Sequence, residues 1–387
     1  MANHGLPEDV LIEIMVRLPV KSIQRFKCVS KSWRDLLKSS IFIKRHQKRD
    51  VRKQHVLLVK RFLRQQDERK NVFSFHDPDF PQVLVSPDLS VPIPDIVPQS
   101  NIQRTLFATV HGPCNGLVCV TFDETVFLCN PALREFRSLP PWNIVYPDQR
   151  YIITNLDNGF GLDPNTGAYK VVRIWLIHHS RGGYRDRSKY PLNQTLRFDL
   201  YNSTSNSWKQ IDPELPNVDL VWWFPCFQLF FNNSIHWCAS TLENQSGCNI
   251  LCFDTSTDAF RLMDYPDQGL QDVAGHLRGL MVLNESLAIF FYRSKEPVNI
   301  WVMKEYGVKE SWTKQFVIGP HDSILNPLLC LGDEWLLYES ENGKLAAWAL
   351  HQNHFKEFQF YEYQNSLRAL VYEECLINLE MLIPGDH

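Results

Sequence analysis

The stretch Leu6-Pro7-Glu8-Asp9-Val10-Leu11-Ile12-Glu13-Ile14, followed by Arg17-Leu18-Pro19-Val20-Lys21-Ser22, decides how the first part of the chain folds. Two Leu-Pro dipeptides lie twelve residues apart, and each is followed by apolar residues at helical spacing. Proline is favoured at the first position of a helix, because its φ angle is preset and its missing N–H has no partner there. We therefore predict that one helix begins at Pro7 and a second at Pro19.

The first predicted helix carries more apolar residues than one buried face requires. Val10, Leu11, Ile14 and Leu18 are spaced for one face, and Ile12 and Met15 lie beside it. A short helix that is apolar nearly all round is deeply buried or meets a second partner. We expect that this helix packs against the chain on one side and meets another protein on the other.

Two further helices are predicted after the second. Ser30 is a suitable N-cap for a helix that bears Trp33, and Ser39 or the residue after it begins another. The predicted core of this helical unit is Ile14, Phe26 and Trp33. Three or four helices in about 45 residues bury too little surface to be stable alone, so the unit needs a partner or a larger body.

The two Leu-Pro dipeptides and Val29-Ser30-Lys31-Ser32-Trp33, at this spacing, resemble the F-box. The F-box is the motif that docks a chain onto a Skp-type adaptor in cullin-based ubiquitin ligases. The resemblance implies a Skp-type adaptor as partner and, through it, cullin and RING subunits. A helical cap on the next domain is the alternative interpretation. The predicted adaptor-facing residues are Leu6, Pro7, Leu18, Pro19, Val29 and Lys31.

The charge of the chain is divided unevenly. Residues 1–70 hold 18 Lys and Arg against 7 Asp and Glu, whereas residues 71–387 hold 22 against 36. The resulting net charges of +11 and −14 indicate two surfaces for two different partners, although solvated charge without a partner would give the same counts.

Several classes of partner do not fit the sequence. The basic runs at 44–49 and 61–70 lack the aromatic-studded platform of nucleic-acid-binding proteins, so we predict no nucleic-acid partner. No apolar run approaches the ~18 residues of a membrane span, and no secretion signal is recognised, so no membrane partner is expected. We expect reduced cysteines and a cytoplasmic or nuclear location.

From His55 onward the sequence changes to short apolar or alternating runs separated by Asn, Asp, Gly and Pro, which is typical of strands. Five units share the order strand, strand, turn, aromatic residue, strand. Such repeats, with several strands in about 40 to 50 residues, predict the blades of a β-propeller in which each aromatic anchor fills the space between neighbouring blades. The anchors, which are 72, 52, 52 and 43 residues apart, are Phe136, Trp208, Phe260, Trp312 and Phe355.

A sixth and weaker unit lies at residues 56–85. The late run 366–372 would return to this unit and close the ring, which removes free sheet edges. We predict an α+β chain with a helical F-box at 1–50 and a large all-β domain at 51–387, folded as a six-bladed kelch-like β-propeller. A pair of β-sandwiches is the alternative.

The body of the chain also resembles a known domain. The segments 111–119 (HGPCNGLVC), 130–132 (NPA), 159–164 (GFGLDP), 169–173 (YKVVR) and 234–237 (SIHW) are similar to the plant F-box-associated domain. With the opening helices, the resemblance covers nearly the whole chain. The sequence of the first fifty residues is most similar to the S-locus F-box group, which acts in pollen during self-incompatibility and recognises pistil ribonucleases.

The sequence contains no common catalytic motif: neither Gly-x-Ser-x-Gly, nor a Walker loop, nor His-Glu-x-x-His is present. Gly159-Phe160-Gly161 lacks the third glycine of a dinucleotide fingerprint, and we interpret it as a tight turn before a strand. His236 with Cys238, Cys248 and Cys252 could be imagined as a zinc set, but no Cys-x-x-Cys pair accompanies it. We predict a core histidine and buried thiols, and no metal, cofactor or catalytic residue.

The segment 178–193 is a polar insertion between two predicted strands, and it explains the 72-residue step between anchors. Loops of this kind carry binding specificity on a rigid scaffold, although a disordered tip is the alternative. Residues 140–151 and 264–271 are two further candidate rims. The predicted target-binding residues are His178, His179, Arg181, Tyr184, Arg185 and Arg187.

The resemblance implies a non-catalytic substrate receptor of a Skp-cullin-F-box ubiquitin ligase. Its β domain would bind a protein target for ubiquitination and proteasomal degradation, and the S-locus wording points to a basic pistil S-ribonuclease and expression in pollen. Two alternatives remain: a receptor for an unrelated plant regulator, and a ligand-binding or enzymatic propeller that carries an F-box.

Overall fold

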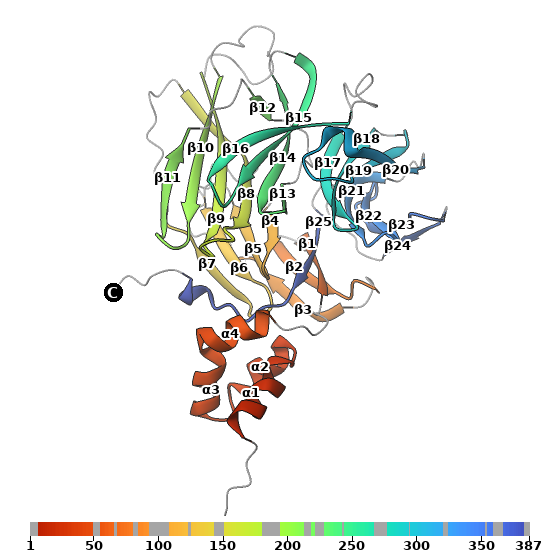
Figure 1. The fold of residues 1–387 in the computed structure, drawn as a ribbon. Helices are drawn as coiled ribbons and strands as arrows, with labels where there is room; N and C mark the ends of the chain where they lie inside the picture. Colours follow the sequence, from red (N-terminus) through yellow and green to blue (C-terminus); the bar gives the residue numbers. More distant parts are fainter. Residues whose placement is uncertain are drawn as a thin grey trace, which may run out of the picture.

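A computed structural model shows four helices followed by six sheets arranged in a ring (Figure 1). The residues that the structure describes are 7–48, 55–65, 68–79, 84–92, 108–122, 125–142, 151–179, 194–212, 218–220, 228–241, 244–266, 277–293, 295–319, 324–352, 354–358 and 367–382. Both predicted parts, a helical F-box and a six-bladed β-propeller, are confirmed, and the β-sandwich alternative is wrong. The proposed boundary at residue 50 stays a prediction.

The F-box consists of α1 (Glu8–Val16), α2 (Val20–Phe26), α3 (Lys31–Lys38) and α4 (Ser40–Gln47). The predicted starts of the first two helices are displaced by one residue. Pro7 and Pro19 are N-caps with ψ angles of 141° and 152°, so each helix begins at the residue after its proline.

The third and fourth helices begin where the serines predict. The Ser30 hydroxyl accepts a hydrogen bond from the backbone N–H of Trp33 at 3.1 Å, and the Ser39 hydroxyl accepts one from Phe42 at 3.2 Å. Each hydroxyl thereby satisfies an N–H group that has no partner within its own helix.

Each sheet is one blade, and neighbouring strands within it are antiparallel. The strands of the blades, named from the ring axis outward, are as follows. Blade 1 contains β25 (Arg368–Glu373), β1 (His55–Gln65), β2 (Glu68–His76) and β3 (Leu84–Ser90); blade 2 contains β4 (Thr109–Cys114), β5 (Leu117–Phe122), β6 (Thr125–Asn130) and β7 (Glu135–Ser138); blade 3 contains β8 (Tyr151–Leu162), β9 (Tyr169–His179), β10 (Gln194–Asn202) and β11 (Ser207–Ile211).

The second half of the ring follows the same plan, except that two short strands share the inner edge of blade 4. Blade 4 contains β12 (Val218–Leu220) and β13 (Leu229–Phe231), both paired with β14 (Ser234–Thr241), then β15 (Asn244–Asp254) and β16 (Ala259–Asp264); blade 5 contains β17 (Leu277–Leu283), β18 (Ser286–Tyr292), β19 (Val298–Met303) and β20 (Trp312–Ile318), with the 3-10 turn η4 (Lys309–Ser311); blade 6 contains β21 (Ile324–Leu331), β22 (Trp335–Ser340), β23 (Leu345–Ala349) and β24 (Phe355–Glu357).

The ring is closed by a strand from the end of the described chain, as the run 366–372 predicts. β25 pairs antiparallel with β1, with Ala369 opposite Val59 and Tyr372 opposite Val56. The first blade therefore combines strands from both ends of the propeller sequence. The 3-10 turn η5 (Leu379–Met381) follows β25 and lies against β6 and β7 of blade 2.

Four of the five predicted aromatic anchors bridge neighbouring blades. Phe136 of blade 2 stacks on Phe73 of blade 1 with ring centroids 6.4 Å apart. The Trp208 indole N–H of blade 3 donates to the Pro140 carbonyl at 2.9 Å. Phe260 of blade 4 packs its ring against Phe198 of blade 3. The Trp312 indole N–H of blade 5 donates to the carbonyl of Asp264, at the end of blade 4.

Phe355 does not bridge blades, and this part of the prediction is wrong. Its side chain is 42% exposed and stacks on Trp348 of its own blade, with centroids 6.2 Å apart. The reason is that β24 is a strand of only three residues, all exposed, at the outer edge of blade 6.

The core is divided among the spaces between blades. Six clusters of buried apolar residues fill these spaces, one for each pair of neighbouring blades. The cluster between blades 2 and 3 is continuous with the F-box, because it also contains Met15, Val16, Leu37 and Phe42. Helices and propeller thus share one core rather than forming two separate ones.

Gly159 and Gly161 lie inside β8, so the predicted tight turn at this place is wrong. They are glycines because blade 4 packs directly onto their backbone. A Cβ atom at Gly159 would lie 2.6 Å from Ile235 Cγ2 and closer still to the Trp237 ring, and one at Gly161 would lie 2.7 Å from Phe230. Close approach of two blades, rather than a positive φ angle, requires these glycines.

Gly159→Ala should lower the free energy of unfolding by about 1–3 kcal/mol, because the added methyl group forces the Trp237 ring out of its position. Urea unfolding followed by tryptophan fluorescence would measure the change. The matched variant is Trp237→Phe, whose smaller ring leaves space. If Gly159→Ala costs the same with Phe at 237 as with Trp, the contact with the Trp237 ring is not the cause.

Candidate functional site

An apolar pair is exposed on α1. Met15 and Val16 of this helix are buried at 1% and 5% exposure, whereas Val10 and Ile14, one turn apart, are 43% and 46% exposed. The prediction that Ile14 belongs to the F-box core is therefore wrong. Because α1 is apolar on both sides, the helical period alone does not show which side faces inward.

The predicted adaptor-facing residues differ in their exposure. Pro7, Pro19, Val29 and Lys31 are exposed, and Val29 reaches 62%. Leu18 is half-buried and packs against the shared core, so its substitution would also disturb the fold. Leu6 lies outside the described residues. Contact of these residues with an adaptor stays a prediction.

Phe26 and Trp33, predicted as F-box core, are half-buried and pack against the shared cluster. Their rings meet edge to face with centroids 5.7 Å apart. This pair joins α2 to α3, which is a reason for an aromatic residue at each position.

The surface of the F-box is basic. Residues 7–48 hold ten Lys and Arg against four Asp and Glu. Arg17 and Arg45 both pair with Glu13, and the second pair ties α4 to α1. The basic residues classed as exposed are Arg17, Lys21, Arg25, Lys31, Arg34, Lys38, Lys44, Arg45 and Lys48.

The propeller has two faces that carry different connections. Because the strands alternate in direction, the first-to-second and third-to-fourth turns of each blade lie on one face, and the second-to-third and blade-to-blade connections lie on the other. The F-box lies on the first of these faces, below β6 and β7 in Figure 1. We call it the F-box face and the other the open face.

All three predicted rim segments connect strand ends on the open face. Residues 140–151 link blades 2 and 3, residues 264–271 lie between blades 4 and 5, and residues 178–193 join the second and third strands of blade 3. His178 and His179 are the last residues of β9, and nothing further is described of their side chains. Arg181, Tyr184, Arg185 and Arg187 lie outside the described residues, so their role stays a prediction.

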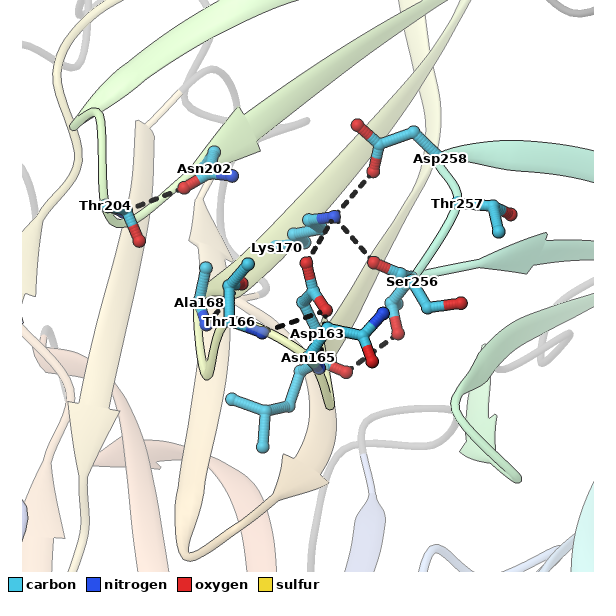
Figure 2. Close-up of polar contacts among 12 residues, drawn as sticks. Asp163, Asn165, Thr166, Ala168, Lys170, Asn202, Thr204, Ser256, Thr257 and Asp258 are labelled. Carbon is cyan, nitrogen blue, oxygen red and sulfur yellow. Dashed lines mark hydrogen bonds and ion pairs between the residues drawn. The ribbon is translucent and has the colours of Figure 1, made fainter.

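A polar network joins blades 3 and 4 on the F-box face (Figure 2). The Lys170 ammonium, only 4% exposed, contacts Asp258 Oδ1 at 2.7 Å and Asp163 Oδ2 at 3.1 Å, and it donates to the Thr255 carbonyl at 2.6 Å. Burial alone would raise the pKa of Asp163, but hydrogen bonds from Asn165, Thr166 and Lys170 hold it below its usual value. Every group of the network is paired within the fold, so we interpret it as a clamp between blades.

Lys170→Met should remove about 3–5 kcal/mol of stability at pH 7, because it leaves the buried Asp163 carboxylate without its cation. The depressed pKa of Asp163 contributes stability above the unfolded pKa near 3.8, and this contribution is lost as pH falls through the folded pKa. The variant should therefore gain less stability than the wild type when pH rises from 2 to 5. Chemical unfolding across this range measures both effects, and adding Asp163→Asn should restore part of the loss.

In the imagined zinc set, Cys238 and Cys252 are buried, and the side chain of Cys248 lies outside the described residues. His236 is fully buried, with Nδ1 3.2 Å from the Leu229 carbonyl and Nε2 2.8 Å from the Tyr306 hydroxyl, so both ring nitrogens are occupied. Burial lowers the pKa of His236 to about 4, which leaves the ring neutral. Within the described ranges, no three His, Cys, Asp or Glu side chains gather as metal ligands.

A second polar cluster lies on the inner strands. His111 of β4 contacts the Thr109 and Thr121 hydroxyls at 3.1 and 3.2 Å, and its Nδ1 is 3.9 Å from Asp157 of β8. Burial, with the nearby charge of Arg368, lowers the pKa of His111 to about 3. Burial raises the pKa of Asp157 to about 7. The ring is thus a neutral hydrogen-bonding group near the axis.

Two family models match the chain. The one described as F-box domain matches residues 4–45, and the one described as F-box associated beta propeller domain matches residues 71–378. None of the described helices has the length and apolar character needed to span a membrane.

Relatives from Arabidopsis thaliana match along most of their length. The F-box protein CPR1 is 23% identical over 390 residues, covering 96% of this chain and 88% of the relative. An F-box/kelch-repeat protein is 25% identical over 350 residues, covering 88% and 86%. Among solved structures, the lectin of Aleuria aurantia covers 84% of this chain and 97% of its own at 8% identity, with a TM-score of 0.35, which is too low to support an argument about function.

Proposed function

Because the chain belongs to the plant F-box proteins with an F-box-associated β-propeller domain, we propose that it is the substrate-recognition subunit of a Skp-cullin-F-box ubiquitin ligase. An F-box domain implies binding to a Skp-type adaptor, which in turn connects to cullin and RING subunits. The propeller then holds the protein to be ubiquitinated and degraded, and the chemistry belongs to other subunits. The chain itself is a receptor and no enzyme.

One observation carries this proposal: the F-box occupies one face of the propeller, and the strand ends that the predicted rim segments connect lie on the other. A receptor that bridges a ligase and a target needs two surfaces that do not obstruct each other. The exposed pair Val10 and Ile14 gives the first surface an apolar centre, and the exposed basic residues between Arg17 and Lys48 suit an acidic adaptor.

For the target, we propose a basic pistil S-ribonuclease, bound in the cytoplasm or nucleus of pollen cells. Two observations support this target: the sequence of the first fifty residues is similar to the S-locus group, and residues 71–387 have a net charge of −14. Complementary charge raises the association rate and disfavours wrong partners. Binding through these charges should weaken when salt increases from 50 to 300 mM.

The test is a pull-down of the full chain with a Skp-type adaptor and a panel of basic S-ribonucleases. The adaptor should bind to the wild type, and at least one ribonuclease should bind in a salt-sensitive way. Exchange of residues 178–193 with those of a related chain should change the preferred ribonuclease without changing adaptor binding. Adaptor binding without any ribonuclease would favour an unrelated plant regulator as target, and failure to bind the adaptor would refute the receptor function.

A further inference from the structure

The segment Glu374–Leu382, which we call the strap, runs between the F-box and the propeller. It leaves β25 in blade 1 and passes between α4 and the ends of β6 and β7, where it is drawn dark blue in Figure 1. Four of its apolar residues are buried in the cluster that also contains the inward residues of the F-box. Those apolar residues, 1–8% exposed, are Cys375, Leu376, Ile377 and Leu379.

A fully buried asparagine fixes the strap to blade 2. Asn130 Nδ2 donates to the Ile377 carbonyl at 2.7 Å and to the Cys375 carbonyl at 3.3 Å. Its Oδ1 accepts the N–H groups of Ala132 and Leu133 in the turn that follows β6. One side chain thus shapes the turn and holds two strap carbonyls that would otherwise lose their water contacts on burial.

The next strand of blade 2 holds the far end of the strap. The Leu379 N–H donates to Glu135 Oε2, and Arg137 Nη1 donates to the Leu379 carbonyl, both at 3.3 Å. On the other side of the strap, the tip of the β4–β5 hairpin contacts Cys375. The approach is so close that a Cβ atom at Gly116 would lie 2.5 Å from Cys375 Cβ. The strap therefore has blade 2 on two sides.

The F-box contributes a charged group to the same junction. Burial lowers the pKa of Lys27, which ends α2, while the charge of Glu135 opposes this shift. Burial raises the pKa of Glu135, and the charges of Lys27 and Lys38 act against that shift. The charges of two F-box lysines therefore act on the carboxylate that accepts the Leu379 N–H. F-box, strap and blade 2 meet around one carboxylate.

We propose that the strap fixes the orientation of the F-box on the propeller, so that adaptor-binding helices and open face move as one rigid unit. The energetic consequence is coupling: the F-box helices gain part of their stability from a segment more than 300 residues away in sequence. The inference deepens the proposed function, since it concerns how the adaptor is held relative to the target. The coupling itself does not depend on which target is bound.

The test compares two leucine-to-alanine variants of the full chain by amide hydrogen exchange. Leu379→Ala removes a strap side chain that is 2% exposed, and Leu337→Ala removes an equally buried one between blades 6 and 1. Leu379→Ala should increase exchange in α1, α3 and α4 at least tenfold while blades 4 to 6 change less than twofold. Leu337→Ala should accelerate exchange in blades 6 and 1 while the helices change less than twofold.

Equal acceleration of helix exchange in both variants, or none in Leu379→Ala, would overturn the proposal. If Leu379→Ala unfolds the whole chain, Gly116→Ala is the second variant, because it displaces Cys375 from the opposite side; unchanged helix exchange there would also refute the role of the strap. Adaptor binding by the wild type is measured alongside. Its failure would refute the receptor function and leave the exchange result intact.

Discussion

Replacing Ile14 with aspartate should weaken binding of a Skp-type adaptor at least 100-fold, about 2.7 kcal/mol, while the propeller stays folded. Ile14 is 46% exposed on the outer side of α1, so the carboxylate meets water in the free protein and costs the fold little. In the complex, the same carboxylate would be buried among apolar groups without a partner, which is costly. Titration calorimetry or surface plasmon resonance with purified adaptor measures the loss.

The matched control is Val317→Asp on the outer strand of blade 5, because Val317 is also apolar and is 59% exposed. It should bind the adaptor as the wild type does. Far-UV circular dichroism and the unfolding midpoint should be nearly unchanged in both variants. Adaptor affinity of Ile14→Asp within threefold of the wild type would exclude the exposed side of α1 from the interface.

Asn130→Ala should lower the free energy of unfolding by about 3 kcal/mol. This loss should be larger than the loss caused by the same substitution at the equivalent turn of blade 3. Asn130 is fully buried, and the substitution leaves the Ile377 and Cys375 carbonyls and two turn N–H groups without their side-chain partner. Groups buried without a partner account for most of this cost. Equilibrium unfolding in urea measures it.

Asn202→Ala is the matched control, because Asn202 occupies the same position in the turn of blade 3. Its Oδ1 accepts from the Thr204 N–H at 2.8 Å, whereas the strap bonds described above go to blade 2. The expected cost is about 1 kcal/mol. Similar losses for the two variants would show that Asn130 acts through its turn alone and that its bonds to the strap add nothing.

The sequence predicted the ring well because each blade carries its own local signal. In blades 2, 3 and 4 the turn before the outer strand begins with Asn or Asp, whose side chain accepts turn N–H groups, and it has a residue of positive φ four positions later, such as Asn206 or Asp258. An aromatic anchor follows two residues further on in Phe136, Trp208 and Phe260. These features are close in sequence, so a repeat of them is visible without coordinates.

The contacts between distant segments could not be predicted in the same way. Consecutive buried residues in the strap follow neither the helical nor the strand period, because they pack against another part of the chain rather than forming a repeat. The apolar run Cys375-Leu376-Ile377, which follows the last blade strand, was the one sequence feature that could have indicated a buried strap. The inward side of α1 was missed for a related reason, since Met15 packs on the shared core and Ile14 does not.

The target surface stays a prediction, and the structure bears only on where its proposed segment is attached. Segment 178–193 joins β9 to β10, and these two strands end and begin on the open face. Which of its side chains bind depends on the shape and charge of a partner, and a single sequence contains neither.

Ring closure by β25 also sets the order in which the molecule can be assembled during synthesis. β25 pairs with β1, which begins at His55, and it emerges more than 300 residues later. At translation rates of about 5–20 residues per second, roughly 15 to 60 seconds pass between the two strands. During this interval the nascent helices exist before the propeller core that will cover Met15 and Val16. An adaptor present at the ribosome would therefore meet the F-box before the strap, which shares the cluster of Met15 and Val16, has been synthesised.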